Sequence, residues 1–288
     1  MISPFSPTVN LLGKSFTLTT EINQRDLNEL LRRAFSSIIW FTYRRNFPIL
    51  KPQSPLKNFI SDTGWGCMIR AGQMMWAEVL KRLWDVKISK DVIELIRLFL
   101  DSEIKLEKAP FSIQQISQKA AKNFNVMPGE WYKATTIIMS LEECYEEYEK
   151  ICEKKEKVIA FSVFPDGCIF VDKILEKVTK AKKCEVCQAK HKAKKRNNST
   201  ENNEKSLKFQ SNLCPTCLHF EKALFLLVCL RLGSAKPNPE YFPMMKYFMR
   251  SPYSVGVLGG RPRRALYFVG YQDDNLIIQD PHYVQVNF

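Results

Sequence analysis

The chain has 288 residues, 45% hydrophobic and 25% charged, which excludes a wholly disordered protein and allows one large domain with a substantial core. The N-terminus has no basic run followed by an apolar stretch, and the longest apolar run, residues 223–230, is far shorter than the ~20 residues that span a bilayer. We therefore expect neither a secretory leader nor a transmembrane helix, and a cytoplasmic protein. Its nine cysteines should be thiols or metal ligands rather than disulfides.

The net charge of +13 is concentrated in one segment. Residues 177–208 contain eleven Lys or Arg and three Glu, a net +8 of the total, and aromatic residues do not interleave with this charge. This distribution argues against nucleic acid as a partner. The basic run at residues 190–196 fits an acidic membrane surface, a nuclear signal or, most simply, a solvated loop.

The N-terminal half is dominated by helical patterns. Residues 1–25 lack a periodic pattern, and we expect an irregular lead-in to a domain over residues 26–288. Apolar spacing predicts helices at residues 25–37, 67–84, 91–100, 113–122 and 135–150, with Ser112 as the N-cap of the fourth. The clearest is 67–84, whose apolar residues are spaced for a single face. An aromatic and β-branched segment occupies residues 38–47.

Strand patterns dominate after residue 157. We predict strands at residues 158–164, 169–174, 255–258, 265–271 and 275–279, a helix at 239–250, and either a buried strand or a short helix at 223–232. Residues 176–220 are rich in Lys and Asn with a cysteine pair near each end, which indicates a basic insertion. Helices mainly in the N-terminal half and antiparallel strands in the C-terminal half predict an α+β fold.

Cys67 begins the clearest helix and follows Gly64 and Gly66. A thiol attacks as the thiolate, and the unpaired N–H groups and partial positive charge of a helix N-terminus favour that anion. The glycines allow a tight turn that can expose the sulfur, and the same amides could hold an oxyanion. The alternative is a buried core cysteine, the commoner state of an intracellular cysteine.

A nucleophilic cysteine needs a base, and the chain has three histidines. His191 and His219 lie in the basic insertion. His282 lies two residues after Asp280, and in an extended segment these two side chains share a face. Because Pro281 disfavours a central strand, we expect a strand end or turn where the carboxylate fixes the imidazole tautomer. A surface turn is the alternative, but with Cys67 the pair forms a coherent triad.

Several segments resemble, in order, the autophagins, the papain-like cysteine peptidases of autophagy that process a ubiquitin-like modifier. The matching segments are residues 40–47, 61–70, 110–113, 128–132, 256–262, 265–268 and 280–282 with Gln285. The most specific is SDTGWGCMIR, residues 61–70. The resemblance spans roughly residues 30–288 apart from the insertion, and implies a papain-like α+β fold.

The resemblance also implies roles for matched positions. These are Cys67 as nucleophile, His282 as general base and acid, Asp280 as the residue that orients His282, Tyr43 as an oxyanion donor, and Trp131 with the loop of Gly260, Arg261 and Pro262 as a lid over the nucleophile. Such a lid would admit only a thin peptide ending in glycine. Without the family, Tyr43 and Trp131 are ordinary packing aromatics.

The implied activity is that of a cysteine endopeptidase that cleaves after the C-terminal glycine of the modifier and also removes the modifier from phosphatidylethanolamine. The partners would be the precursor and lipid-conjugated modifier, with transient contact to a membrane surface and no catalytic cofactor. Family members usually continue beyond the position of Phe288, and many have a second cysteine where this chain has Ala71. The alternative is therefore a C-terminally truncated, catalytically weak or inactive modifier-binding protein.

Two CxxC pairs, 26 residues apart, lie in the insertion. They consist of Cys184, Cys187, Cys214 and Cys217, and this pattern predicts a tetrahedral zinc site although the gap is long. His191 or His219 could replace one ligand. Four thiolates leave no open position, so the zinc would be structural. The alternative is four unligated thiols in a loop.

Overall fold

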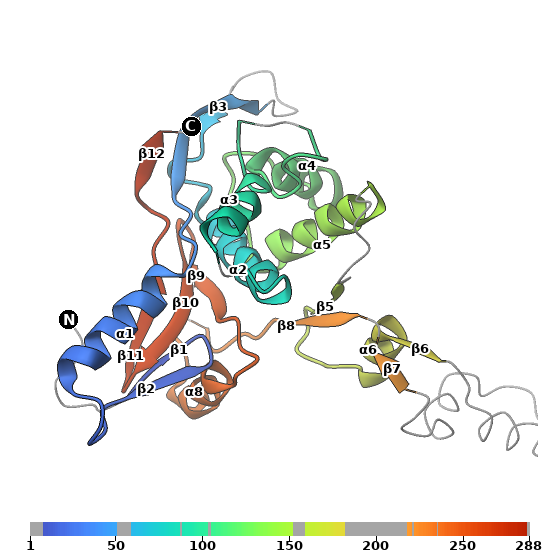
Figure 1. The fold of residues 1–288 in the computed structure, drawn as a ribbon. Coiled ribbons are helices and arrows are strands. Elements are labelled where there is room, and N and C mark those ends of the chain that lie inside the picture. The colour runs from blue at the N-terminus through green and yellow to red at the C-terminus, as the bar shows by residue number, and fades with distance from the viewer. Residues whose placement is uncertain are drawn as a thin grey trace, which may run out of the picture. The chain divides into compact units, whose positions relative to one another are not determined.

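The computed structural model describes residues 8–50, 59–86, 88–102, 105–151, 159–181, 218–220, 222–234 and 236–286. The chain divides into two units, Met1–Glu153 with Arg231–Phe288, and Lys154–Leu230. The first unit combines a group of helices with an antiparallel sheet, which confirms the predicted α+β fold (Figure 1). In the described part of the chain, no helix is both long and apolar enough to cross a bilayer.

The main sheet of the first unit contains strands from both ends of the chain. Its order is β11 (Asn275–Gln279), β10 (Arg264–Gln272), β1 (Thr8–Leu11) and β2 (Lys14–Thr17), with β9 (Val257–Arg261) also paired to β10. All these pairs are antiparallel. Helix α1 (Gln24–Ser36) packs on the sheet through Leu27 and Leu31 against Val9. The short helix η2 (Pro239–Tyr241) leads into α8 (Phe242–Arg250), which contacts β1 and β10.

The β1–β2 hairpin corrects the expectation of an irregular lead-in over residues 1–25. Its two-residue turn consists of Leu12, with φ 46°, and Gly13, with φ 77°. Turns with two positive φ angles normally contain Asn or Asp before Gly. Because this turn has leucine at that position, the sequence does not indicate a hairpin. Tertiary contacts stabilise this conformation: Leu12 is buried, and its N–H donates to the Val269 carbonyl at 2.8 Å.

The four predicted helices between residues 67 and 150 are confirmed. They are α2 (Cys67–Leu83), α3 (Ser89–Arg97), α4 (Ile113–Phe124) and α5 (Ala134–Ile151). Ser112 caps α4 and accepts the Gln115 N–H at 3.4 Å, as predicted. The single apolar face predicted for α2 is wrong, because every residue from Cys67 to Leu80 is buried. Helix α2 lies between α3, α5 and strand β10, so it forms the centre of this unit.

A second, small sheet brings the last described residues beside β3 (Tyr43–Leu50). Strand β12 (Val284–Val286) pairs with β3 in parallel, and β4 (Phe59–Ser61) pairs with the other edge of β3 in antiparallel. The register places Val284 opposite Tyr43. Two segments about 240 residues apart in sequence therefore meet at Tyr43.

The second unit contains β5 (Ile159–Phe164) paired in parallel with β8 (Ala223–Val228), and β6 (Thr179–Ala181) paired in antiparallel with β7 (Leu218–Phe220). The predicted strand at residues 169–174 is wrong. Helix α6 (Val171–Val178) forms instead, because Val171, Ile174, Leu175 and Val178 recur at helical spacing. The ambiguous segment at 223–232 is a strand, β8.

The packing of α2 on α5 gives a stability prediction. A Cβ added to Gly72 would lie 2.5 Å from Ile137 Cγ2. We expect Gly72→Ala to cost about 1–3 kcal/mol of the free energy of unfolding, and Ile137→Ala to cost about 2–5 kcal/mol. The double variant should lose less than the sum, because Ile137→Ala removes the clashing methyl group. Urea unfolding measures all three, and strict additivity would contradict this packing.

Candidate active site

Cys67 is the first residue of α2 and follows a turn closed by Asp62. The Asp62 carbonyl accepts N–H groups from Trp65 (3.1 Å) and Gly66 (2.8 Å). Gly64 has φ +86°, so it supplies the positive φ that this turn requires. Cys67 thus lies at a helix N-terminus, where the first-turn N–H groups have no partner within the helix. Contrary to the expectation of an exposed sulfur, Cys67 is 0% exposed, so burial alone does not distinguish a nucleophile from a core cysteine.

Asp280 and His282 form the pair expected from their spacing. His282 Nδ1 lies 2.5 Å from Asp280 Oδ1, and the His282 backbone N–H donates to the same oxygen at 2.9 Å. The two side chains are 25% and 34% exposed. Because Nδ1 faces the carboxylate, Nε2 is the nitrogen available to a reacting group. Nε2 is buried and has no hydrogen-bond partner among the described residues.

Tyr43 packs against His282 and is also a neighbour of Cys67. Its ring packs edge-on against the His282 imidazole, with centroids 5.5 Å apart and planes at 89°. Its hydroxyl has no partner with full hydrogen-bond geometry within the described residues, but it lies close enough to the Cys67 thiol to interact with it. Burial, and then the neighbouring Cys67, raise the pKa of Tyr43, so the phenol remains a proton donor.

Segment 280–284 is attached to β3 and to the residues just before it. Trp40 Nε1–H donates to the Asp280 carbonyl at 2.8 Å, and the Tyr43 N–H donates to the Pro281 carbonyl at 3.0 Å. Trp40 also packs edge-on against Tyr283, with centroids 5.5 Å apart. The expectation of a strand end at Pro281 is therefore correct, since β12 begins only at Val284. No sequence pattern indicates a role for Trp40, apart from its place in the matching segment 40–47.

Of the residues expected to form a lid, contacts of a neighbouring residue place only Trp131 near the Cys67 turn. Tyr132 is fully buried against Trp65 (6.0 Å), and Trp65 packs against Phe59 (5.5 Å), so the segment that contains Trp131 lies beside the Cys67 turn. Trp131 itself is half-buried. Gly260 and Arg261 are exposed at the end of β9, and Pro262 is exposed in the turn to β10. Among the described residues, no hydrogen bond or ring contact joins these four residues to Cys67.

The predicted zinc ligands lie outside the described residues. Cys184, Cys187, Cys214 and Cys217 all fall in residues 182–217, between β6 and β7. In the part of the chain that the structure describes, no three His, Cys, Asp or Glu side chains gather as a metal site would require. The zinc site therefore stays a prediction from sequence.

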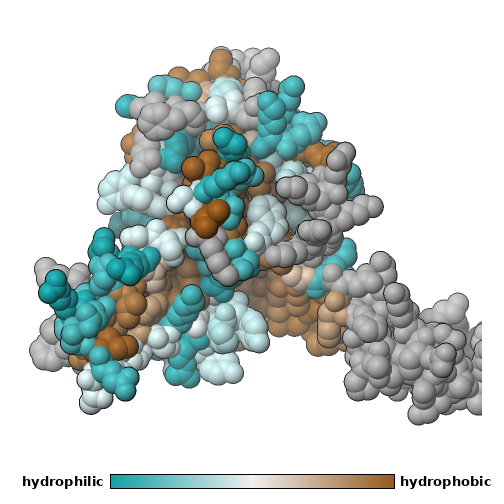
Figure 2. All heavy atoms as spheres, in the orientation of Figure 1, coloured by the Kyte–Doolittle hydropathy of each residue, from teal (hydrophilic) through white to brown (hydrophobic). Residues whose placement is uncertain are grey.

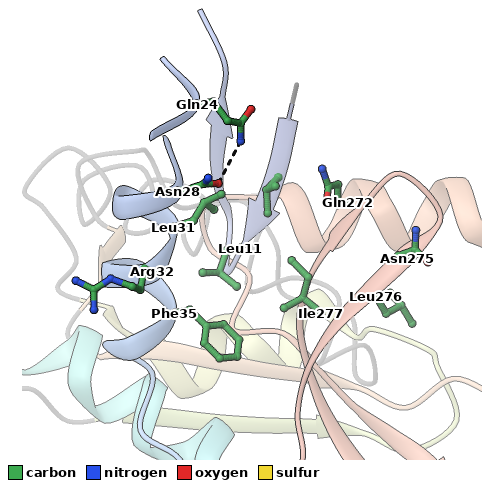
Figure 3. A pocket seen from close by; sticks show the side chains of 11 residues that line it. Leu11, Gln24, Asn28, Leu31, Arg32, Phe35, Gln272, Asn275, Leu276 and Ile277 are labelled. Carbon is green, nitrogen blue, oxygen red and sulfur yellow. Dashed lines mark hydrogen bonds between the residues drawn. The ribbon is translucent and has the colours of Figure 1, made fainter. Parts of the chain in front are cut away.

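A cavity of about 910 Å³ lies elsewhere, between α1 and the main sheet. Figure 2 shows exposed hydrophobic residues beside α1. Figure 3 shows that Leu11, Leu31, Phe35 and Ile277 line the cavity. Its one charged lining side chain, Arg32, pairs with Glu29 at 2.9 Å. Since this lining offers no nucleophile and no base, the cavity is not the active-site candidate.

The Asp280–His282 geometry predicts one imidazole tautomer. In neutral His282 we expect the proton on Nδ1, because Asp280 can only accept. Asp280→Asn should allow the other tautomer, since the amide can also donate from its NH₂ group. ¹⁵N spectra of histidine-labelled protein would show this change, with His282→Gln identifying the signal. An unchanged tautomer in Asp280→Asn would contradict the geometry.

Comparison with known proteins identifies the family of the chain. The family model described as the peptidase C54 catalytic domain matches residues 28–288. The chain is 31% identical over 287 residues to the cysteine protease ATG4B of Xenopus laevis, and 31% identical over 283 residues to the cysteine protease ATG4A of Bos taurus. Each alignment covers 96% of this chain, which spans 65% and 64% of the length of these two relatives. The chain therefore belongs to the peptidase C54 family, which confirms the resemblance to the autophagins.

Proposed function

We propose that this protein is a cysteine endopeptidase that cleaves after the C-terminal glycine of a ubiquitin-like autophagy modifier. The observation that carries this proposal is the placement of Tyr43 against both Cys67 and the Asp280–His282 pair. Membership of the peptidase C54 family supports the same activity. By the same chemistry, the site would release the modifier from phosphatidylethanolamine, whose amide to the glycine is the bond cleaved.

In the proposed reaction, His282 Nε2 takes the proton of the Cys67 thiol, and the sulfur attacks the carbonyl carbon of the terminal glycine. The Tyr43 hydroxyl and the amides at the start of α2 donate hydrogen bonds to the oxygen as it becomes negative. The intermediate collapses to a thioester as the amine leaves with the proton from His282. Water then attacks the thioester and gives a proton to His282, and the sulfur leaves as the free enzyme re-forms.

A substrate can reach the Cys67 sulfur only if residues that cover it move, because the side chain is fully buried. We assign the lid to Trp131 and the turn of Gly260, Arg261 and Pro262. The ring contact between Tyr132 and Trp65 supports this role for Trp131. Tyr132 directly follows Trp131, and its contact holds this segment beside the Cys67 turn. A narrow opening would select an extended tail whose last residue, glycine, has no side chain.

Catalytic roles can be tested with a modifier that carries extra residues after its glycine. We expect Cys67→Ala and His282→Ala to abolish cleavage, and Tyr43→Phe to lower kcat by about 100-fold, as for the loss of one oxyanion donor. Tyr253→Phe is the matched control, because Tyr253 is 90% exposed and its hydroxyl should not affect the rate. Full activity of Cys67→Ala would disprove the proposal.

The alternative is a modifier-binding protein without activity. Binding of the modifier by the wild type without cleavage would favour this alternative over the enzyme. In either case the partner is the folded modifier, as precursor or as lipid conjugate, with transient membrane contact in the second case and no nucleic acid. The described cysteines, Cys67, Cys144, Cys168 and Cys229, are free thiols, which supports action in the reducing cytoplasm.

We retain the structural zinc as a proposal for the insertion, based on the two CxxC pairs. Native mass spectrometry with and without a chelator should show the loss of one zinc ion. A variant with Cys184→Ser and Cys187→Ser should show no zinc while keeping the cleavage activity, since the metal takes no part in the proposed reaction. An unchanged mass after chelation would exclude a bound metal.

A further inference from the structure

A buried charge cluster lies beside the Cys67 turn, and the mechanism above does not use it. Arg70 lies one turn after Cys67 on α2. Its guanidinium contacts Asp62 (Nε–Oδ2, 2.7 Å), Asp101 (Nη1–Oδ2, 2.7 Å) and Gln73 (Nη1–Oε1, 3.0 Å). The ion-paired side chains are at most 3% exposed. Burial would lower the pKa of Arg70, but Asp101 and Asp62 raise it, so the guanidinium stays charged.

Stability alone does not explain such a cluster. Buried ion pairs are often replaceable by apolar side chains without loss of stability, because desolvation offsets their attraction. Their geometry is more specific, since each carboxylate oxygen here has a defined donor. The two carboxylates connect different segments of the chain.

Asp62 connects the two segments that carry Cys67 and Tyr43. Its Oδ1 accepts the backbone N–H of Arg44, the residue after Tyr43, at 2.6 Å. Its carbonyl accepts the N–H groups of Trp65 and Gly66, directly before Cys67. We propose that Asp62, held by Arg70, is a positioning residue that fixes the Cys67 turn against strand β3 and so sets the nucleophile relative to the oxyanion donor. This inference rests on the proposed peptidase function.

Gly66 supports the same assignment. Its φ of −80° is accessible to any residue, so the backbone does not require glycine. A Cβ at this position, however, would lie 2.4 Å from Asp62 Oδ2. Gly66 lies in the expected turn, but the reason for glycine is space: its hydrogen side chain gives Asp62 room to pack against the residue before the nucleophile.

Asp101 is bonded to Arg70 in the same way but connects different segments. Its Oδ1 accepts the Ile113 N–H at 2.9 Å, and its carbonyl accepts Gln114 Nε2–H at 2.7 Å, both at the start of α4. The carboxylates of Asp62 and Asp101 thus each accept one backbone N–H and one N–H of the Arg70 guanidinium. The difference is the backbone N–H that each carboxylate accepts: Asp62 accepts that of Arg44, next to Tyr43, whereas Asp101 accepts that of Ile113 at the start of α4, which makes Asp101 a matched control.

The test compares Asp62→Asn with Asp101→Asn. An Asn oxygen can serve only one of the two donors, and its NH₂ group opposes the other, so both variants lose an equivalent interaction. We expect Asp62→Asn to lower kcat by about 10- to 100-fold with KM unchanged, as for a displaced reacting group. Asp101→Asn should stay within about twofold. Losses of kcat that are alike in both variants, and parallel to their losses in Tm, would overturn the proposal.

Amide hydrogen exchange provides a readout that does not depend on the modifier. We expect faster exchange at Arg44, Trp65 and Gly66 in Asp62→Asn, and at Ile113 instead in Asp101→Asn. If the wild type fails to cleave, the proposed function fails, and exchange alone decides whether Asp62 fixes the turn. Equal exchange at the turn in both variants would then overturn the positioning role.

If Asp62→Asn does not fold, Gly66→Ala replaces it. The added methyl group displaces Asp62 while every charge is kept, and alanine tolerates the observed backbone angle. We expect the same tenfold or greater loss of kcat, again on the order of the cost of a displaced reacting group. A fully active Gly66→Ala would count against the proposal, because Asp62 could then move without effect.

Discussion

The Asp62 carboxylate is the junction on which the site depends. One oxygen accepts the Arg44 N–H on β3 and the other accepts Arg70 Nε–H on α2, so a single buried side chain joins the strand of Tyr43 to the helix of Cys67. A buried carboxylate needs such donors to remain charged at low cost. Arg70 supplies a positive charge and, through Asp101, extends the junction to the start of α4.

Strand β3, which carries Tyr43, also holds the segment that contains Asp280 and His282. The Tyr43 N–H and the Trp40 indole hold the carbonyls of Pro281 and Asp280, and β12 then runs in register along β3. Residues 40–44 are therefore bonded both to Asp62, at the start of the Cys67 turn, and to Asp280 and Pro281, directly before His282. A displacement of this segment would move both reacting groups relative to Tyr43, whose hydroxyl is the proposed oxyanion donor.

Local sequence signals predicted the parts of the site but not its assembly. The glycine-rich turn, the helix after Cys67 and the Asp280–His282 spacing are short-range features, and the resemblance to the autophagins is confirmed by the family match. The parallel pairing of β12 with β3 joins segments far apart in sequence, so no local pattern indicates it.

The Arg70 cluster was also missed, because single charged residues usually lie on the surface. Its one signal was an arginine within an otherwise apolar stretch of α2. The hairpin at Leu12 was missed because tertiary contacts stabilise a turn that its residues do not indicate. Helix α6 was missed because a short apolar segment is compatible with a strand as well as with a helix.

The central claim is that Cys67 is the attacking atom of a peptidase site. It is tested most directly by a modifier whose C-terminal glycine carries a thiol-reactive electrophile in place of the scissile bond. Mass spectrometry of the product should show one modifier attached to the peptide that contains Cys67, and Asp280→Asn should slow this reaction strongly. An adduct on the exposed Cys168 instead, or none at all in folded protein that binds the modifier, would contradict the account.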